Sequence, residues 1–217
     1  ACNATGWTKS FSNFAGSIHL PLSLPQWFSG FCSFNSAATC GQKVSPTMTQ
    51  ASDFGATGDG VTDDTSAIQH AIDEGVGELV LPRGDYRITR PIVIDLAKSG
   101  RTSIRGESGT CRILMQGAGP AFSFVGTHKG SADPTSFSES AWTHERMPMI
   151  SQVEIVGQHA QADGVQIEGV MQPVITGVLL RKLRHGIRIT GRARNVLISH
   201  CQVYHNLGVG IYLDSVN

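Results

Sequence analysis

The sequence predicts an all-β protein, a parallel β-helix in which the chain winds as a solenoid of stacked coils. Two observations lead to this prediction. Short apolar segments of three to five residues follow one another and are separated by turns that contain glycine. From Ile150 onward these segments also recur at a period of 22 to 25 residues. Self-similarity at such a period is typical of solenoid proteins.

The repeat is clearest in a row of glycines. Gly164, Gly186 and Gly210 each precede a short strand segment, and they are separated by 22 and 24 residues. A second row agrees, because pairs of apolar residues that flank one outward residue recur after 25 and 23 residues. These pairs are Val153/Ile155, Val178/Leu180 and Cys201/Val203. Leucine-rich repeats share the period, but their leucine–asparagine signature is missing, so a parallel β-helix fits better.

Residues 1–50 differ in composition from the rest of the chain. Only Lys9 and Lys43 are charged, and Pro21 and Pro25 interrupt an alternating apolar segment, as in an edge strand or an extended arm. We interpret residues 1–50 as an arm that packs on the solenoid, with a partner-binding segment as the alternative. Residues 51–217 then form the β-helix domain.

The segment that follows the arm predicts a turn, a helix and two strands. Its glycines suit tight turns, and Asp63 or Asp64 is placed to cap a short helix. Gly75 is placed to end that helix in a left-handed conformation. The apolar stripe of the helix consists of Ala67, Ile68, Ala71 and Ile72. Strands are expected at residues 79–81 and 86–88.

Residues 53–94 resemble the opening segment of the pectate-lyase-like right-handed parallel β-helix proteins. The resemblance implies a right-handed β-helix whose first coil is capped by the short helix near residues 64–74. It also implies a carbohydrate-active protein that acts on a polysaccharide as a lyase, hydrolase or epimerase, in a secreted or cell-surface setting. The alternative is a non-catalytic polysaccharide-binding or structural β-helix of the tailspike or adhesin type, because the fold does not determine the reaction.

Further strands are expected at residues 92–94, 103–105, 112–115 and 121–125. Residues 127–148 lack strand periodicity and interrupt the series. A long loop in a compact repeat protein is often functional. It either walls a groove or is a mobile insertion.

Charge and composition narrow the possible partners. The net charge is zero and the basic residues lack interleaved aromatic residues, so nucleic-acid binding is not expected. The chain has no run of eighteen apolar residues that would cross a membrane. Five cysteines are present, and two of the first three, Cys2, Cys32 and Cys40, suit a disulfide if the protein is exported. Because the last coil ends at Asn217 without a cap, we expect missing C-terminal coils or an oligomeric partner to cover the solenoid end.

Stacked coils bring equivalent residues within about 4.8 Å of one another. Asp163 and His185 precede equivalent glycines, so we expect them to be neighbours. We assign proton transfer to His185, orientation of its ring to Asp163, and stabilisation of negative charge to Arg188. The expected substrate contacts are Glu168, Tyr212 and Asp214. The alternative is a turn-stabilising pair beside a solvated surface ladder.

Two other groups of charged residues are candidates for binding. The cations between Arg181 and Arg194 suit an acidic polysaccharide if they share a face, although half of them should lie in turns. Asp59, Asp63 and Asp64 resemble a calcium site, because hard cations take clustered carboxylates. Helix capping already explains two of these three, so we expect no cofactor and keep calcium as the alternative.

Overall fold

The computed structural model describes residues 48–131, 133–136 and 138–216. The predicted arm therefore lies almost entirely outside the described residues, as do Cys2, Cys32 and Cys40. Cys111 and Cys201 are both free thiols. The boundary of the β-helix domain stays a prediction, although the first strand of the solenoid, β1 (Thr49–Gln50), already pairs with a strand of the next coil.

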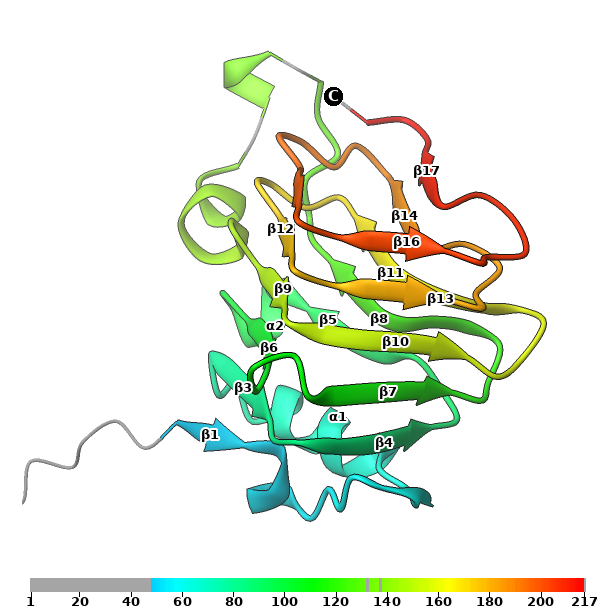
Figure 1. The fold of residues 1–217 in the computed structure, drawn as a ribbon. Coiled ribbons are helices and arrows are strands. Elements are labelled where there is room, and N and C mark those ends of the chain that lie inside the picture. The colour runs from blue at the N-terminus through cyan, green and yellow to red at the C-terminus, as the bar shows by residue number, and fades with distance from the viewer. Residues whose placement is uncertain (1–47, 132, 137, 217) are drawn as a thin grey trace, which may run out of the picture. The chain divides into compact units, whose positions relative to one another are not determined.

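The described chain forms three sheets in which every strand pair is parallel (Figure 1). Sheet A contains β1, β3 (Glu78–Leu81), β6 (Ser103–Gly106), β9 (Met149–Ser151), β12 (Val174–Thr176) and β15 (Leu197–Ser199). Sheet B contains β2 (Asp59–Asp63), β4 (Gly84–Ile88), β7 (Cys111–Met115), β10 (Val153–Gly157), β13 (Leu179–Arg181) and β16 (Gln202–Tyr204). Sheet C contains β5 (Ile92–Asp95), β8 (Gly119–Val125), β11 (Ala162–Glu168), β14 (Ile187–Thr190) and β17 (Ile211–Leu213).

The chain visits the sheets in the order A, B, C, so each turn of the solenoid takes one strand from each. We number the coils 1 to 5, from β3–β4–β5 to β15–β16–β17. The predicted all-β parallel solenoid is confirmed, and the strands predicted from residue 79 to residue 125 all lie within strands of the structure.

The glycine row is in register on adjacent coils, as predicted. The Gly164 N–H donates to the His185 carbonyl, and Val165 pairs with Ile187 and donates to the Gly186 carbonyl. A Cβ on Gly164 would lie 2.3 Å from that same carbonyl oxygen. Glycine is therefore required here by the close approach of two coils rather than by a special backbone conformation.

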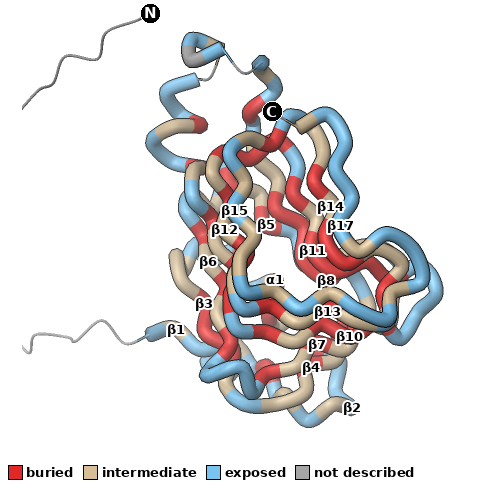
Figure 2. The backbone as a smooth tube through the Cα atoms, turned by 45° about the horizontal axis from the view of Figure 1, so that its top comes forward, coloured by how far each residue is buried: buried red, intermediate tan, exposed pale blue. Residues whose placement is uncertain are grey.

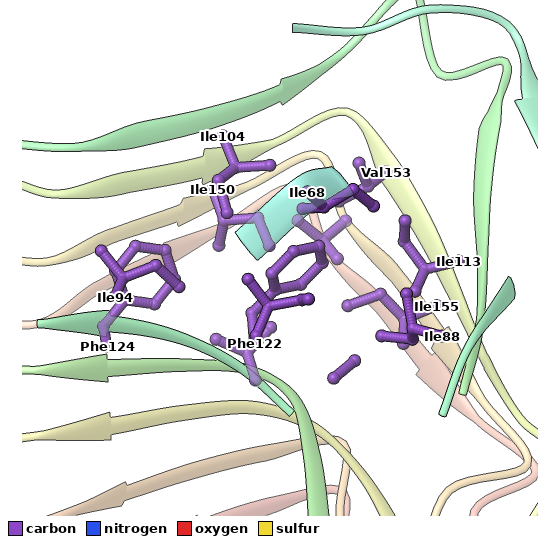
Figure 3. Packing of buried hydrophobic residues seen from close by; sticks show 14 of the residues in the cluster. Ile68, Ile88, Ile94, Ile104, Ile113, Phe122, Phe124, Ile150, Val153 and Ile155 are labelled. Carbon is purple, nitrogen blue, oxygen red and sulfur yellow. The ribbon is translucent and has the colours of Figure 1, made fainter. Parts of the chain in front are cut away.

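Helix α1 (Thr65–Asp73) lies at one end of the stack and covers its apolar interior (Figure 1). Ile68, Ala71 and Ile72 are at most 1% exposed. Figure 3 shows Ile68 reaching the isoleucines that line the inside of the coils. The predicted cap helix is thus confirmed, and Gly75 follows it with a left-handed φ of 68°.

The two acidic residues before α1 hold different parts of the turn. The Asp63 carboxylate accepts the Thr65 N–H at 3.1 Å, at the first residue of the helix. Asp64 is 1% exposed, and its carboxylate accepts the N–H groups of Thr57 at 2.7 Å and of Gly58 at 3.1 Å. The acidic pair therefore joins the preceding turn to the start of the helix.

Inward residues of all three sheets fill the interior of the solenoid (Figure 3). Figure 2 shows the buried positions recurring along the strands of successive coils. On coils that have a neighbour on both sides these side chains are almost fully buried. Ile189 on coil 4, for example, is 1% exposed. On coil 5 similar residues are open to solvent. Ile211 and Leu213, which continue the inward rows of Ile187 and Ile189, are 42% and 58% exposed.

The long segment between β8 and β9 lies along the corner where sheet C leads into sheet A. It contains the short helices η2 (Pro134–Ser136) and η3 (Ala141–Glu145). The buried Glu145 carboxylate accepts the Thr127 N–H at 2.7 Å, and the His128 N–H donates to the Gly169 carbonyl at 2.9 Å. Smaller helices at other corners are η1 (Ala51–Phe54) and α2 (Leu96–Ser99).

Candidate functional site

Three of the predicted site residues meet on the outward face of sheet C. Arg188 pairs with Gln166 on one side and with Tyr212 on the other. The His185 ring stacks on the Tyr212 ring with 5.7 Å between centroids and 30° between planes. The Arg188 guanidinium lies 5.9 Å from the same ring centroid. We call His185, Arg188 and Tyr212 the sheet C cluster.

Asp163 is a neighbour of His185 but holds its backbone and not its ring. The carboxylate is 1% exposed and forms a fork of two hydrogen bonds with the Arg184 guanidinium, one of them 2.9 Å long. It also accepts the His185 N–H at 3.1 Å. Hydrogen bonding to Asp163 raises the pKa of Arg184 above its usual range. A guanidinium donates two parallel N–H groups that match the two oxygens of a carboxylate, whereas an imidazole nitrogen donates one. The buried Asp163 carboxylate therefore pairs with Arg184 and not with the His185 ring.

The backbone constrains the protonation of the His185 ring. Its Nδ1 atom accepts the Val209 N–H at 3.3 Å. A neutral imidazole that accepts at one nitrogen carries its hydrogen on the other, so we assign the hydrogen to Nε2 by this hydrogen bond. In this tautomer, His185 offers a donor to a ligand that lies on the sheet.

Glu168 and Asp214 lie where the strands of sheet C end. Glu168 pairs with Thr190 of the next coil, and the Asp214 N–H donates to the Ile189 carbonyl at 2.9 Å. This register places the two acidic residues on either side of Thr190. Their backbones are therefore about two coil spacings apart, roughly 9.6 Å. Both residues are exposed.

The cations between Arg181 and Arg194 do not share a face. The Arg181 Nε atom donates to Glu154 at 2.7 Å on sheet B, whereas Arg184 binds Asp163 at the next corner. Arg194 lies at the corner beyond sheet C and donates to the Asp133 carbonyl at 3.4 Å. Turns separate these residues, and Arg181 and Arg184 each form a local ion pair. The condition under which the cations would together suit an acidic polysaccharide, a shared face, is therefore not met.

The carboxylate oxygens of Asp59, Asp63 and Asp64, the candidate calcium site, already accept hydrogen bonds. Asp59 accepts the N–H groups of Thr62 and Val61 at 2.7 and 2.8 Å, which holds its pKa at about 2. Asp63 accepts hydroxyl groups as well as an N–H. Within the described ranges, no group of three or more His, Cys, Asp or Glu residues is arranged to hold a metal ion. The proposed absence of a cofactor stays a prediction.

The sequence interpretation missed a ladder of ion pairs on sheets A and B. Arg105 binds Glu78 at 3.0 Å, and Arg112 binds Asp85 through its Nε atom at 2.9 Å. In both pairs, and in the pair of Arg181 with Glu154, the arginine follows the acid by 27 residues. The signal that would have revealed them is an acidic residue followed by arginine after 27 residues. This spacing is one coil for Asp85 and two residues more than one coil for Glu78 and Glu154.

No helix in the described part of the chain is long and apolar enough to cross a membrane.

Comparison with known proteins places the chain in a family. A family model described as rhamnogalacturonase A/epimerase, pectate lyase-like, matches residues 48–160. Mannuronan C5-epimerase AlgE5 of Azotobacter vinelandii is 58% identical over 41 residues, which are 17% of this chain and 4% of that protein.

Two solved structures share the fold. The A-module of the Azotobacter vinelandii mannuronan C-5 epimerase AlgE4 has 20% identity and a TM-score of 0.56, over 72% of this chain and 45% of that one. PfbA, a surface adhesin of Streptococcus pneumoniae, has 19% identity and a TM-score of 0.50, over 71% of this chain and 38% of that one. The chain spans less than half the length of each of these relatives, and likeness at this identity shows the fold alone.

The family model covers just over half of the chain, and the parallel β-helix with its N-terminal cap helix agrees with it. The chain belongs to the rhamnogalacturonase A/epimerase, pectate lyase-like family.

Proposed function

We propose that this protein acts on a polysaccharide and that the outward face of sheet C binds the substrate. The observation that carries the proposal is the sheet C cluster. It places an imidazole, a guanidinium and a phenol side by side on coils 4 and 5. These groups together bind sugar hydroxyls and carboxylates, and the coil spacing repeats the contacts along an extended chain. The family to which the chain belongs is described by the names of carbohydrate-active enzymes, which also supports a polysaccharide substrate.

Each group in the cluster has a role that follows from its contacts. Arg188 binds a substrate carboxylate and stabilises the negative charge that develops there. His185 donates from Nε2 to the same region, and Tyr212 transfers a proton or stacks on a sugar ring. Asp163 is a positioning residue, because it holds Arg184 and the backbone of His185. This arrangement revises the earlier prediction that Asp163 orients the imidazole directly.

The arrangement supports two kinds of reaction on this face. A lyase or an epimerase removes the proton beside a uronate carboxylate, and Arg188 is placed to bind that carboxylate. An inverting hydrolase needs two carboxyl groups about 6.5–9.5 Å apart. The backbone spacing of Glu168 and Asp214, roughly 9.6 Å, is just above that range, and side chains that lean towards each other bring the carboxyl groups within it.

A non-catalytic binding module is the second candidate. The observation that favours it is that Arg184 occupies the carboxylate closest to His185. The cluster then recognises a sugar without a free base beside the imidazole. In either case we propose a secreted or cell-surface setting, where polysaccharides are encountered, and no resident cofactor.

A panel of polysaccharides distinguishes these candidates. The chain is incubated with polymannuronate, polyguluronate, polygalacturonate, rhamnogalacturonan and neutral glucans. Unsaturated ends are followed by ultraviolet absorbance, reducing ends by a colorimetric assay and C5 inversion by proton NMR. We expect one of these products from one of the acidic polymers. Binding without any product supports the second candidate, and no interaction with any polymer contradicts both.

Variants of the sheet C cluster test the site. We expect Arg188→Ala and His185→Ala each to lower turnover by about a hundredfold or more, because each removes a group that contacts the developing charge. Arg90→Ala is the control, since Arg90 is an exposed guanidinium on coil 1. Melting temperatures should stay unchanged in all three. Full turnover in His185→Ala would exclude the role proposed for that ring.

A further inference from the structure

Sheet B carries a groove on a different face of the solenoid from the sheet C cluster. A hollow of about 440 Å³ lies over the start of strands β4 and β7, and one of about 220 Å³ lies over the start of β10 and β13. Gly109 and Glu154 line both hollows, so the two lie side by side along the sheet. We call this the sheet B groove. It follows the corner where sheet A leads into sheet B.

The groove is open because glycine alternates with long polar residues along this corner. A Cβ on Gly109 would have no neighbour within 4 Å, and one on Gly177 would meet only atoms at 3.8 Å or beyond. Both glycines have left-handed φ angles, of 68° and 63°. At the corners of coils 3 and 5 the chain instead carries Gln152 and His200, with left-handed φ angles of 56° and 54°.

Left-handed conformations at non-glycine residues are uncommon and cost free energy. Gln152 and His200 are exposed, so their side chains do not pack into the core. As at several other corners of the solenoid, the chain here carries non-glycine residues, an amide and an imidazole, at positions that glycine adopts more easily. Their side chains stand at the edge of the groove, where they can reach a ligand.

The floor of the groove consists of outward residues in register on five coils. These are Asp85, Arg112, Glu154, Leu179 and Gln202. The charges on the floor are compensated in pairs, because Arg112 binds Asp85 and Arg181 binds Glu154. At the end of the groove, Arg83 and Asp59 add one charge of each sign.

A floor with balanced charges does not favour a polyanion. It does offer many hydrogen-bond donors and acceptors, since each guanidinium has five N–H groups and each carboxylate has lone pairs beyond those used within the pair. Leu179 lies between Glu154 and Gln202 and supplies an apolar surface. Alternating polar groups and an apolar platform at a spacing of about 4.8 Å match the hydroxyl groups and the C–H face of successive sugar rings.

We propose that the sheet B groove is a second, non-catalytic site that binds an extended, uncharged oligosaccharide. This site is separate from the proposed substrate face on sheet C. The protein therefore holds a neutral glycan on one face while the sheet C cluster acts on another. The proposal does not depend on whether the cluster is catalytic.

Calorimetric titration with neutral hexasaccharides tests the groove. The probes are cellohexaose, xylohexaose and maltohexaose, with a hexaguluronate as the acidic comparison. We expect at least one neutral probe to bind, and its affinity to change little between 50 mM and 500 mM salt, because no net charge is neutralised. Failure of all three neutral probes to bind, or tighter binding of the acidic probe in the groove, would overturn the proposal.

A double variant locates the binding. Gln152→Gly with His200→Gly removes both polar side chains and relaxes two left-handed positions, so folding should not suffer. We expect affinity for the neutral probe to fall at least tenfold. The matched control is His205→Gly, which makes the same change at a left-handed position of coil 5 outside the groove, where φ is 52°.

Arg188→Ala separates the two faces. We expect it to leave binding of the neutral probe unchanged, although it lowers the turnover proposed for the sheet C cluster. If the double variant binds as the wild type does and Arg188→Ala does not bind, the neutral sugar occupies the sheet C face and the proposal is wrong.

Discussion

The two ends of the described solenoid carry similar apolar residues but bury them to different degrees. At the end covered by α1, Ile68 and Ile72 are at most 1% exposed. On coil 5, Ile211 and Leu213 are 42% and 58% exposed, although they pair with coil 4 in the same register as the inner coils do. Residue type is thus not what sets burial in this fold. Each coil is buried by the layer on either side of it, so stability depends on neighbouring layers.

The largest expected effect comes from truncating matched side chains at the two ends. Ile68→Ala should lower the free energy of unfolding by about 2–5 kcal/mol, because it leaves a cavity between α1 and the coils. Leu213→Ala should change it by only about 0.5 kcal/mol, since most of this side chain is already in water. Urea unfolding of both variants measures the difference. Equal losses would show that both ends are covered in solution.

The glycine row provides the next comparison. Gly164→Ala places a Cβ 2.3 Å from the Gly186 carbonyl oxygen, and the coils must move apart. We expect a loss of about 1–3 kcal/mol, as for other overpacked positions. At Gly210, the nearest atom to an added Cβ is a methyl group of Val203 at 3.3 Å. Gly210→Ala should therefore lower the free energy of unfolding by less than about 1 kcal/mol, as most substitutions near the surface do. A larger loss for Gly210→Ala than for Gly164→Ala would contradict this account of the row.

A smaller effect is expected on the pH dependence of stability, where a buried histidine, His128, is compared with an exposed one, His205. His128 is 2% exposed, and neither ring nitrogen has a hydrogen-bond partner. Burial, together with nearby Arg194, lowers the pKa of His128 below 6.5. The unfolded chain therefore binds a proton more readily than the folded one. This contribution to stability is complete above the unfolded pKa and is lost as the pH falls towards the folded pKa.

Unfolding midpoints at several pH values test this expectation. The midpoint should fall as the pH is lowered through and below 6.5, and His128→Gln should reduce that slope. His205→Gln is the control, because His205 is exposed. Parallel pH profiles for the wild type and His128→Gln would show that the ring is accessible to protons in the folded protein.

The smallest expected effect is that of calcium on the end covered by α1. Each oxygen of Asp59, Asp63 and Asp64 already accepts a hydrogen bond, from the turn, from the helix or, for one oxygen of Asp63, from the Thr89 hydroxyl group. Calcium would have to replace these bonds, so millimolar calcium or a chelator should leave the melting temperature unchanged. A clear rise with calcium would restore this turn as a candidate metal site.

The sequence predicts the fold well because solenoid packing repeats local patterns. The register of Gly164 with Gly186 and the apolar stripe of α1 both follow from spacing alone. The short strand β2 and helix α2 were not predicted, because they lack an apolar repeat of their own. The corner segments differ in length from coil to coil, so a fixed repeat period does not show which corner residues are equivalent.

The site is harder to predict, because the repeat spacing shows which residues lie on adjacent coils but not which side chains form hydrogen bonds with each other. It correctly brings Asp163 beside His185 and Arg188 beside Tyr212. It does not show that Arg184 competes with the His185 ring for the carboxylate. That outcome depends on side-chain direction at a corner, where the alternation of a strand no longer applies.

The segment between β8 and β9 also affects how the molecule opens. It starts from coil 2, and its Asp133 carbonyl binds Arg194 at the end of coil 4. On its other side, the Thr143 carbonyl accepts a hydrogen bond from Arg101 at 2.8 Å, at the start of coil 2. Contacts in a solenoid normally join adjacent coils only. This segment acts as a clamp across three coils, so their amide protons should exchange together as one cooperative unit while coil 5 exchanges first.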